Sequence, residues 1–273
     1  MANNSNLSKR AALRQQQEME ERNKRTKRIM MFGLGLAALV VVVVLAIVIV
    51  QAVGNRTSIA EDQLTPPNAT ENYGILIDGN EPTEDKPHLI VWEDFQCPAC
   101  AAREAAFGPI IEQLVADGDI TAEIRTAKFL DDTREDGPSF RAAVAAAAAD
   151  EVGHYKEFHR IAYENQNTGY TDQVLRGDVA EAAGITGEDL TRFQELYNSR
   201  AFKDFVDNAN DKFNEDEIDA TPAYVVSGKR LQFVDANKQV LIQPTAQDLL
   251  RAITQAWEAG DKQIDTKPEP YQR

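Results

Sequence analysis

The sequence predicts an α/β domain that follows a single N-terminal transmembrane helix. Three observations lead to this prediction: an apolar run at residues 30–50, two cysteines between a predicted strand and a predicted helix, and strand signals that return after a long helical stretch. With 273 residues, 43% of them hydrophobic, the chain is long enough for one sizeable domain with appendages.

The N-terminal segment predicts a membrane anchor. Residues 30–50 are 21 consecutive residues without a charge, the length that crosses a bilayer as a helix. Residues 1–29 carry eight Lys/Arg against three Glu, and basic flanks tend to stay in the cytoplasm. We therefore expect a cytoplasmic tail over 1–29, a single-pass helix in the cell membrane over 30–50, and an extracytoplasmic domain. A cleaved signal peptide is the alternative, although its apolar region is usually shorter.

Composition limits the possible roles of the chain beyond the anchor. Residues 51–85 are rich in Asn, Thr, Pro and acidic residues, which predicts an extracytoplasmic stalk and linker. Beyond residue 50 the chain carries 41 Asp/Glu against 21 Lys/Arg, and so acidic a domain repels phosphate backbones, which argues against nucleic-acid binding. Two cysteines and three histidines are too few for a disulfide-held scaffold or a structural zinc site, so no metal is expected.

The first two predicted strands enclose the cysteine pair. Residues 88–95 are partly β-branched and aromatic, which predicts a buried strand. A helix follows from Pro98, a residue that fits the first helical turn because its missing N–H costs nothing there. Residues 120–130 alternate apolar and polar side chains and predict a second strand, parallel to the first through a right-handed crossover.

The position of the cysteines at the start of a helix predicts a redox-active pair. Cys97 lies at the helix N-terminus, where free N–H groups and the helix dipole favour a thiolate. Cys100 is three residues further on, so the two sulfurs share a helix face and can form a disulfide. We predict that Cys97 is the exposed nucleophile and Cys100 the buried resolving cysteine. A passive structural disulfide is the alternative, but so short a loop adds little stability.

The remaining elements complete the α/β prediction. Residues 138–213 are expected to form a helical insertion. Residues 223–226 and 230–234 predict two strands around a turn, and a final helix is capped at Thr245. Residues 263–273 are expected to be a frayed C-terminal tail.

Two further features are interpreted from residue type. Pro222 follows Thr221 just before the returning strand, and it marks either the start of an edge strand or a cis peptide bond. The sequence leaves this choice open. His154 and His159 lie in the helical insertion without metal-type partners, so we interpret them as surface or core residues and not as ligands.

Three segments together resemble the DsbA-like branch of the thioredoxin superfamily. They are residues 93–100 with the Cys-Pro-Ala-Cys motif, 158–166 in the helical insertion, and 220–229 around the Thr-Pro pair. They occur in the family's order within residues 86–262. The resemblance implies a thioredoxin fold with a helical insertion.

The resemblance also implies a function. Pro222 would be the family's cis-proline, facing the redox-active Cys97–Cys100 disulfide, and the backbone of Thr221 would pair with an extended substrate. The family oxidises cysteines in exported proteins, needs no other cofactor, and is reoxidised by a membrane partner of the VKOR-like or DsbB-like kind. Single-pass anchoring is typical of such proteins in Gram-positive bacteria, actinobacteria included.

The sequence departs from the family's pattern in two places. Many relatives carry a buried carboxylate where this chain has Val91, and Glu93 on the same strand face could take over its proton-transfer role. Glu93 and Asp94 would oppose a thiolate at Cys97 if they were not screened. Ala99, beside Pro98 between the cysteines, stands where strongly oxidising relatives have histidine, so a milder oxidant is expected.

Other functions stay open on the sequence alone. The principal alternative is a disulfide reductase or isomerase of the same fold that a different membrane partner keeps reduced. Isomerases of this superfamily usually dimerise through an added domain, and no such segment is evident. A non-redox chaperone or binding module, or a metal carrier, is a further alternative. Copper-delivery relatives, however, need three residues between their cysteines instead of two.

Overall fold

The computed structural model describes residues 59–270. The predicted cytoplasmic tail (1–29), the predicted transmembrane helix (30–50) and the first residues of the predicted stalk lie outside this part of the chain. Within residues 59–270, none of the helices combines the length and the apolar character that crossing a membrane requires.

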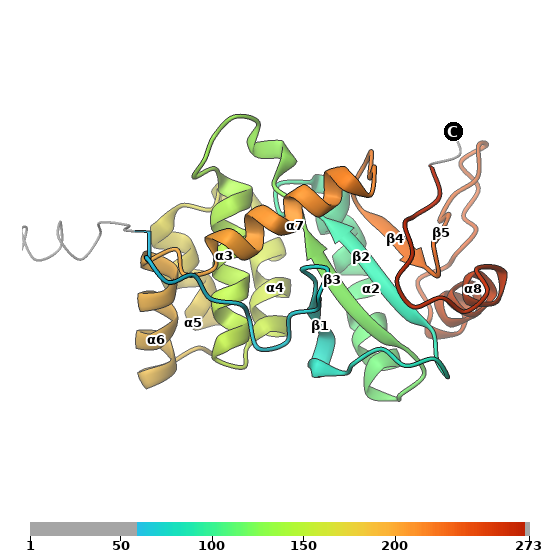
Figure 1. The fold of residues 1–273 in the computed structure, drawn as a ribbon, viewed down its shortest axis with the longest axis horizontal. Helices are drawn as coiled ribbons and strands as arrows, with labels where there is room; N and C mark the ends of the chain where they lie inside the picture. The colour runs from blue at the N-terminus through green and yellow to red at the C-terminus, as the bar shows by residue number, and fades with distance from the viewer. Residues whose placement is uncertain (1–58, 271–273) are drawn as a thin grey trace, which may run out of the picture. The chain divides into compact units, whose positions relative to one another are not determined.

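The described residues form a five-stranded mixed sheet flanked by helices (Figure 1). The strands are β1 (Ile75–Leu76), β2 (His88–Glu93), β3 (Thr121–Thr126), β4 (Ala223–Val226) and β5 (Lys229–Arg230). The α-helices are α2 (Pro98–Ala116), α3 (Pro138–Glu151), α4 (Tyr155–Glu164), α5 (Ala180–Ala182), α6 (Gly187–Asn198), α7 (Lys203–Glu215) and α8 (Ala246–Ala259).

The sheet confirms the predicted strand–helix–strand unit. Its order is β1-β3-β2-β4-β5, and β2 pairs in parallel with β3 while the other pairs are antiparallel. In the parallel ladder His88 lies opposite Thr121 and Glu93 opposite Thr126. All six residues of β2 are buried, because this central strand has structure on both of its faces.

The two faces of β2 contact different layers. Leu89 and Val91 belong to the main core, which contains the buried residues of α2, α3 and α8. Ile90 and Trp92 point the other way, into a smaller core where Trp92 meets Phe213 of α7 edge-to-face at 5.7 Å. The period-2 alternation of the strand therefore places Glu93 on the face of the sheet that α2 covers.

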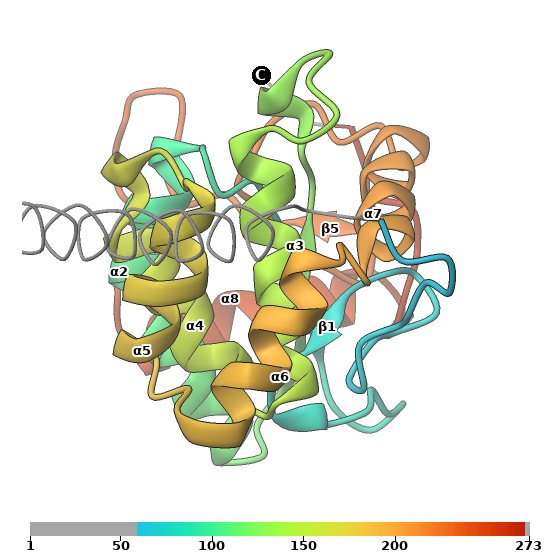
Figure 2. The same ribbon diagram turned by 90° about the vertical axis from the view of Figure 1, so that its left-hand side faces the viewer.

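The helical insertion lies between β3 and β4, as predicted, and its helices run from 138 to 215. Figure 1 shows α3, α4, α5 and α6 grouped together beside the sheet, at the opposite end of the domain from α8, and Figure 2 views this group from its outer side. Every residue from Ala142 to Ala149 in α3 is buried. Alanine side chains are small, so α4, α6 and α7 can approach this central helix closely.

The β4–β5 hairpin is shorter than predicted. Ser227 and Gly228 form the predicted turn, with φ of 51° and 76°, the combination that a type I′ hairpin requires. The second strand ends at Arg230 instead of Val234. A second turn follows at Asp235, whose carboxylate accepts the N–H groups of two following residues.

The predicted stalk is wrong for the part that the structure describes. From residue 60 the chain lies on the domain: Leu64 N donates to the Ala201 carbonyl at 2.7 Å, and Asn68 donates twice to the Asp150 carboxylate, at 2.9 and 2.8 Å. The residues of β1 then pair with β3. The polar composition suggested a linker, but Ile75, Leu76 and Ile77 are buried and the backbone of the stretch finds acceptors on the domain.

The prediction of a frayed C-terminal tail is also wrong for residues 263–270. Gln263 N donates to Ser227 Oγ at 2.7 Å, and Asp265 accepts from the Arg125 guanidinium at 2.7 Å. Arg125 is 1% exposed and also pairs with Glu123. A buried cation needs carboxylate partners, so the charge in β3 holds the C-terminal segment in place.

Substitution of Asp150 tests whether the segment before β1 is bound to the domain. We expect Asp150→Ala to lower the free energy of unfolding by about 1–3 kcal/mol, because the two Asn68 donors lose their acceptor in a half-buried site. The measurement is urea unfolding of the full-length chain. Glu151→Ala is the matched control on the same helix; its side chain is 30% exposed, and a change within about 0.5 kcal/mol is expected. Equal effects of both substitutions would contradict the docking.

Candidate active site

The cysteine pair occupies the first turn of α2, as predicted. Cys97 is the N-cap residue, Pro98 the first helical residue, and the Cys97 sulfur accepts the backbone N–H of Cys100 at 3.4 Å. Both cysteines are free thiols. Cys97 is 8% exposed and Cys100 2% exposed, while Pro98 and Ala99 between them are exposed. The prediction that Cys97 is exposed is therefore wrong: it is buried, although less deeply than Cys100, and the exposed residues of the motif are Pro98 and Ala99.

The structure brings the Thr-Pro pair to Cys97. The Thr221–Pro222 peptide bond is cis, which resolves the alternative that the sequence left open. Cys97 Sγ lies 3.4 Å from the Thr221 carbonyl oxygen, across 124 positions in the chain. The loop before β4 thus forms the second wall of the site, opposite the start of α2.

The two thiols differ in acidity. The hydrogen bond from the Cys100 thiol lowers the pKa of Cys97 to about 5, with help from Thr221 and the backbone N–H groups of the first turn, although burial opposes it. The pKa of Cys100 is raised, first by that same hydrogen bond, then by burial and by the negative charge of Glu93. At neutral pH the pair is a thiolate at Cys97 and a thiol at Cys100.

The sequence suggested that Glu93 and Asp94 would oppose the Cys97 thiolate, and the structure shows a different arrangement. Glu93 acts on Cys100, since its charge is among the causes that raise the pKa of that thiol. The Asp94 carboxylate accepts hydrogen bonds from the backbone N–H groups of Gln96 and Leu130, at 2.9 and 3.1 Å. Burial raises the pKa of Asp94 to about 6.

The helical insertion holds the redox loop, which we define as residues 94–97. Gln166 donates its side-chain amide to the carbonyls of Phe95 and Cys97, at 2.7 and 3.0 Å, and the Tyr170 hydroxyl donates to the Phe95 carbonyl at 3.2 Å. The Phe95 ring stacks on Tyr163 with centroids 5.0 Å apart. These contacts satisfy the loop's buried carbonyls and fix where α2 begins.

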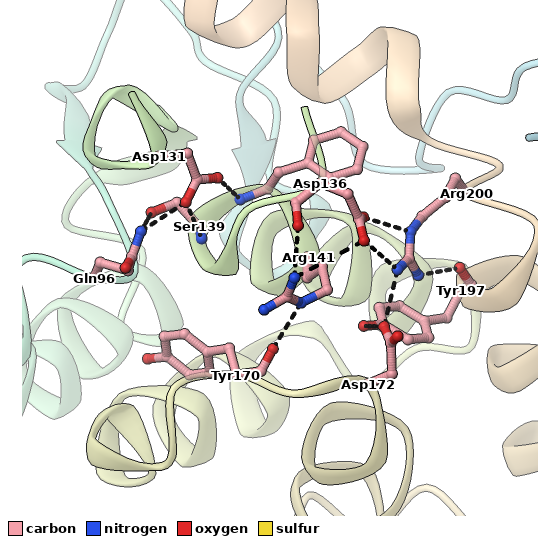
Figure 3. Close-up of polar contacts among 10 residues, drawn as sticks. Gln96, Asp131, Asp136, Ser139, Arg141, Tyr170, Asp172, Tyr197 and Arg200 are labelled. Carbon is pink, nitrogen blue, oxygen red and sulfur yellow. Dashed lines mark hydrogen bonds and ion pairs between the residues drawn. The ribbon is translucent and has the colours of Figure 1, made fainter. Parts of the chain in front are cut away.

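A second set of contacts ties the redox loop to the start of α3. Gln96 donates its side-chain amide to Asp131 at 2.7 Å and to Ser139 at 2.8 Å (Figure 3). Asp131 in turn accepts the backbone N–H groups of Ser139 and Phe140. The loop before Cys97 is therefore held from both α3 and α4.

Glu93 is buried at the end of β2 and meets a histidine of α4. His159 Nε2 lies 2.6 Å from Glu93 Oε1. Both residues are buried, with no more than 5% of their surface exposed. Burial raises the pKa of Glu93, although the histidine opposes that shift. The interpretation of His159 as a core residue holds, but no sequence pattern pointed to its carboxylate partner.

Sequence reasoning missed the residues of the insertion that reach the redox loop. Gln166 and Tyr163 lie in the stretch 158–166 that carried the family resemblance, yet only that resemblance pointed to them. Tyr170 had no signal. Such polar contacts to backbone carbonyls follow no period of 2 or 3.6 residues, so a pattern search does not detect them.

The acidity of Cys97 can be measured by thiolate absorbance near 240 nm on the reduced full-length chain. We expect a midpoint near pH 5, and a higher midpoint in Cys100→Ala, because that variant loses the hydrogen bond that lowers this pKa most. Cys97→Ala, which lacks the nucleophile, should show no transition in this range. A wild-type midpoint close to 9, the ordinary value for a thiol, would contradict the arrangement.

The same shift predicts how stability depends on pH. The folded-state pKa of Cys97 lies below its unfolded value of about 9, so the reduced chain gains stability above that value and loses it as pH falls towards 5. Urea unfolding of the reduced protein should therefore show this loss between about pH 9 and pH 5, and Cys97→Ala should lack the corresponding contribution. Parallel pH profiles of the two proteins would contradict it.

Comparison with known proteins agrees with this geometry. Residues 77–242 match the family model described as "Thioredoxin". Solved structures with the same fold include two MdbA proteins titled thiol-disulfide oxidoreductases. The one from Actinomyces oris is 20% identical, with a TM-score of 0.57 over 73% of this chain and 95% of that one. The one from Corynebacterium diphtheriae is 23% identical, with a TM-score of 0.53 over 63% and 90%.

A third similar structure is the oxidised BdbD from Bacillus subtilis, 17% identical, with a TM-score of 0.51 over 72% of this chain and 100% of that one. The comparison with curated proteins gave no match. The predicted thioredoxin fold is confirmed by the family match, which spans more than half of the sequence and includes both cysteines and the Thr-Pro pair. The chain belongs to the thioredoxin family.

Proposed function

We propose that the protein is a thiol–disulfide oxidoreductase of DsbA type that introduces disulfides into exported proteins through Cys97-Pro98-Ala99-Cys100. The observation that carries this proposal is the opposite acidity of the two thiols at the start of α2, with Cys97 beside the Thr221 carbonyl. The similar MdbA proteins are described as thiol-disulfide oxidoreductases, which supports the same activity.

The reaction transfers two electrons from a substrate dithiol to the enzyme disulfide. A substrate thiolate attacks Cys97 Sγ, the Cys97–Cys100 bond breaks, and Cys100 leaves as a thiolate that takes up a proton. The substrate's second thiolate then attacks the substrate sulfur of the mixed disulfide. Cys97 leaves as a thiolate, the substrate keeps a disulfide, and the enzyme holds a dithiol.

The acidity of Cys97 favours this direction. A low pKa makes Cys97 a good leaving group and stabilises the reduced enzyme, which is the product of substrate oxidation. Hydrogen bonds at the first helical turn supply the stabilisation that the missing histidine at position 99 does not.

Substrate contact fits the exposed parts of the site. The Thr221 backbone beside Cys97 would pair with an extended segment of substrate, a form of strand addition, with Pro222 next to the reacting sulfurs. Pro98 and Ala99 are exposed and small, so they would allow varied cysteine-containing sequences to approach. Glu93, buried behind Cys100, would exchange the proton of the resolving thiol.

The setting and the partner follow from the chain's N-terminal segment. Residues 30–50 would anchor the protein in the cell membrane, with the tail 1–29 in the cytoplasm and the redox domain outside. Because each turnover leaves a dithiol, an electron acceptor must reoxidise the pair. A membrane partner of VKOR-like or DsbB-like kind would fill this role beside a membrane-anchored enzyme.

A reductase is the second candidate, and Ala99 is the observation that favours it. A neutral residue between the cysteines adds no positive charge to hold the Cys97 thiolate, which moves the potential towards reducing values. The same site would then donate electrons to substrate disulfides.

The reduction potential of the Cys97–Cys100 pair decides between these directions. We expect about −120 to −180 mV for the full-length chain equilibrated with glutathione, in the range of oxidising members of the superfamily. A value near −270 mV, as in thioredoxin, would assign the reductase role instead.

Trapping identifies the exchange mechanism in cells. We expect Cys100→Ser to accumulate mixed disulfides between Cys97 and exported proteins, because no resolving thiol remains to release them. Non-reducing gels followed by identification of the bound proteins make the measurement. Cys97→Ser is the matched control and should trap nothing. If Cys97→Ser keeps full activity on exported proteins, the non-redox chaperone is the better description.

A further inference from the structure

A histidine of the helical insertion lies between two carboxylates. His159 of α4 contacts Glu93 of β2 through Nε2 at 2.6 Å and Glu104 of α2 through Nδ1 at 3.6 Å. His159 is 5% exposed and Glu93 3%, whereas the Glu104 side chain keeps 12% of its surface. The line Glu93–His159–Glu104 therefore runs from the buried end of β2 towards the surface.

The surroundings of the histidine keep it charged. Burial lowers the pKa of His159, but the two carboxylates outweigh burial and raise it well above its usual value. The pKa of Glu93 is raised and that of Glu104 is lowered. Other titratable groups also face this line from the elements packed against it. They are Cys100 and Glu112 of α2, Tyr155, Lys156, Arg160 and Tyr163 of α4, Tyr170 of the insertion and Tyr224 of β4.

Glu104 opens onto a surface cavity. The cavity has a volume of about 240 Å³ and lies between α2 and α4, where Glu104, Ala105, Arg160 and Glu164 line it. A volume of this size holds several water molecules. Solvent therefore reaches the outer carboxylate of the line, while Cys100 at its inner end is 2% exposed.

We propose that His159 and Glu104 form the outer half of a proton path that connects Cys100, through Glu93, to this cavity. The inference rests on the proposed function, because only an enzyme that breaks and remakes the Cys97–Cys100 bond must move a proton on and off Cys100. His159 and Glu104 are positioning residues in this path: they act on Cys100 through Glu93.

The protons balance over the cycle without rotation of the imidazole ring. When Cys100 must become a thiolate, its proton passes to the Glu93 oxygen that does not face His159. Once Glu93 is neutral, it no longer stabilises the positive charge of His159, so the pKa of the imidazolium falls. The Nδ1 proton then leaves through Glu104 to water in the cavity. When Cys100 departs as a thiolate in the other half of the cycle, Glu93 returns its proton to the sulfur. His159 then takes one from solvent through Glu104, and Nε2 keeps its proton on Glu93 throughout.

Single-turnover reaction of the reduced full-length chain with an aromatic disulfide tests the path. Cys97 first releases one coloured nitrothiobenzoate ion, and attack of Cys100 on the resulting mixed disulfide releases a second. We expect Glu104→Gln and His159→Gln to leave the first release unchanged. They should slow the second at least about tenfold and shift its pH profile; this is less than the 10²–10⁴-fold effect of a group that transfers the proton directly, because both residues act through Glu93. Glu157→Gln, which removes an exposed carboxylate of α4, should change neither step.

The outcomes separate the possible roles. Glu104→Asp should restore the second release and its pH profile if a carboxylate at this position carries the proton. If Glu104→Gln folds with wild-type stability and releases both ions at wild-type rates and pH dependence, the proposal is overturned. The reaction of Cys97 and Cys100 with the aromatic disulfide needs no protein substrate, so a failure to oxidise exported proteins would count against the proposed function and leave this result standing.

Discussion

The hydrogen bond between the two cysteines at the first turn of α2 is the interaction on which the site depends. It is the largest of the causes that lower the pKa of Cys97 and raise the pKa of Cys100, so one contact acts in opposite directions on two identical side chains. The contact requires Cys97 at the N-cap and Cys100 one turn later, with free N–H groups directed at the first sulfur. The rest of the domain serves to hold this turn in place.

The sheet and the helical insertion share that task. β2 is the central strand, buried on both faces, and delivers the redox loop to the start of α2. The insertion then satisfies the loop's carbonyls through Gln166 and Tyr170 and packs Tyr163 against Phe95. A loop with its backbone groups bonded on two sides moves little, which keeps Cys97 beside the Thr221 carbonyl.

Buried charges have two separate uses on the two faces of the sheet. On the face covered by α2, Glu93, His159 and Glu104 form a connected line that ends at a surface cavity, and we propose that it carries the proton of the resolving cysteine. On the other face, Arg125 pairs with Glu123 and with Asp265 of the C-terminal segment, which fastens that segment across the sheet. Removing a charged group from water is costly unless an opposite charge lies beside it. In both sets that opposite charge comes from a distant part of the chain.

The sequence by itself determined the elements whose signals are local. The strand before Cys97, the helix after it, the parallel return of β3 and the helical insertion all follow from apolar periodicity and from capping residues that act within one or two turns. The chemistry of Cys97 was also readable, because the helix N-terminus that favours its thiolate is built from its immediate neighbours. The tight turn at Ser227 and Gly228 was predicted for the same reason.

Only the tertiary structure decided which distant groups meet at the site. Thr221 lies 124 positions from Cys97, and Glu93 is 66 positions from His159. Likewise, Asn68 and Asp265 bind partners that turned a predicted stalk and a predicted tail into parts of the domain. These contacts join single polar side chains, which leave no periodic signal, and they form because a buried charge or carbonyl must find a partner wherever the fold brings one near.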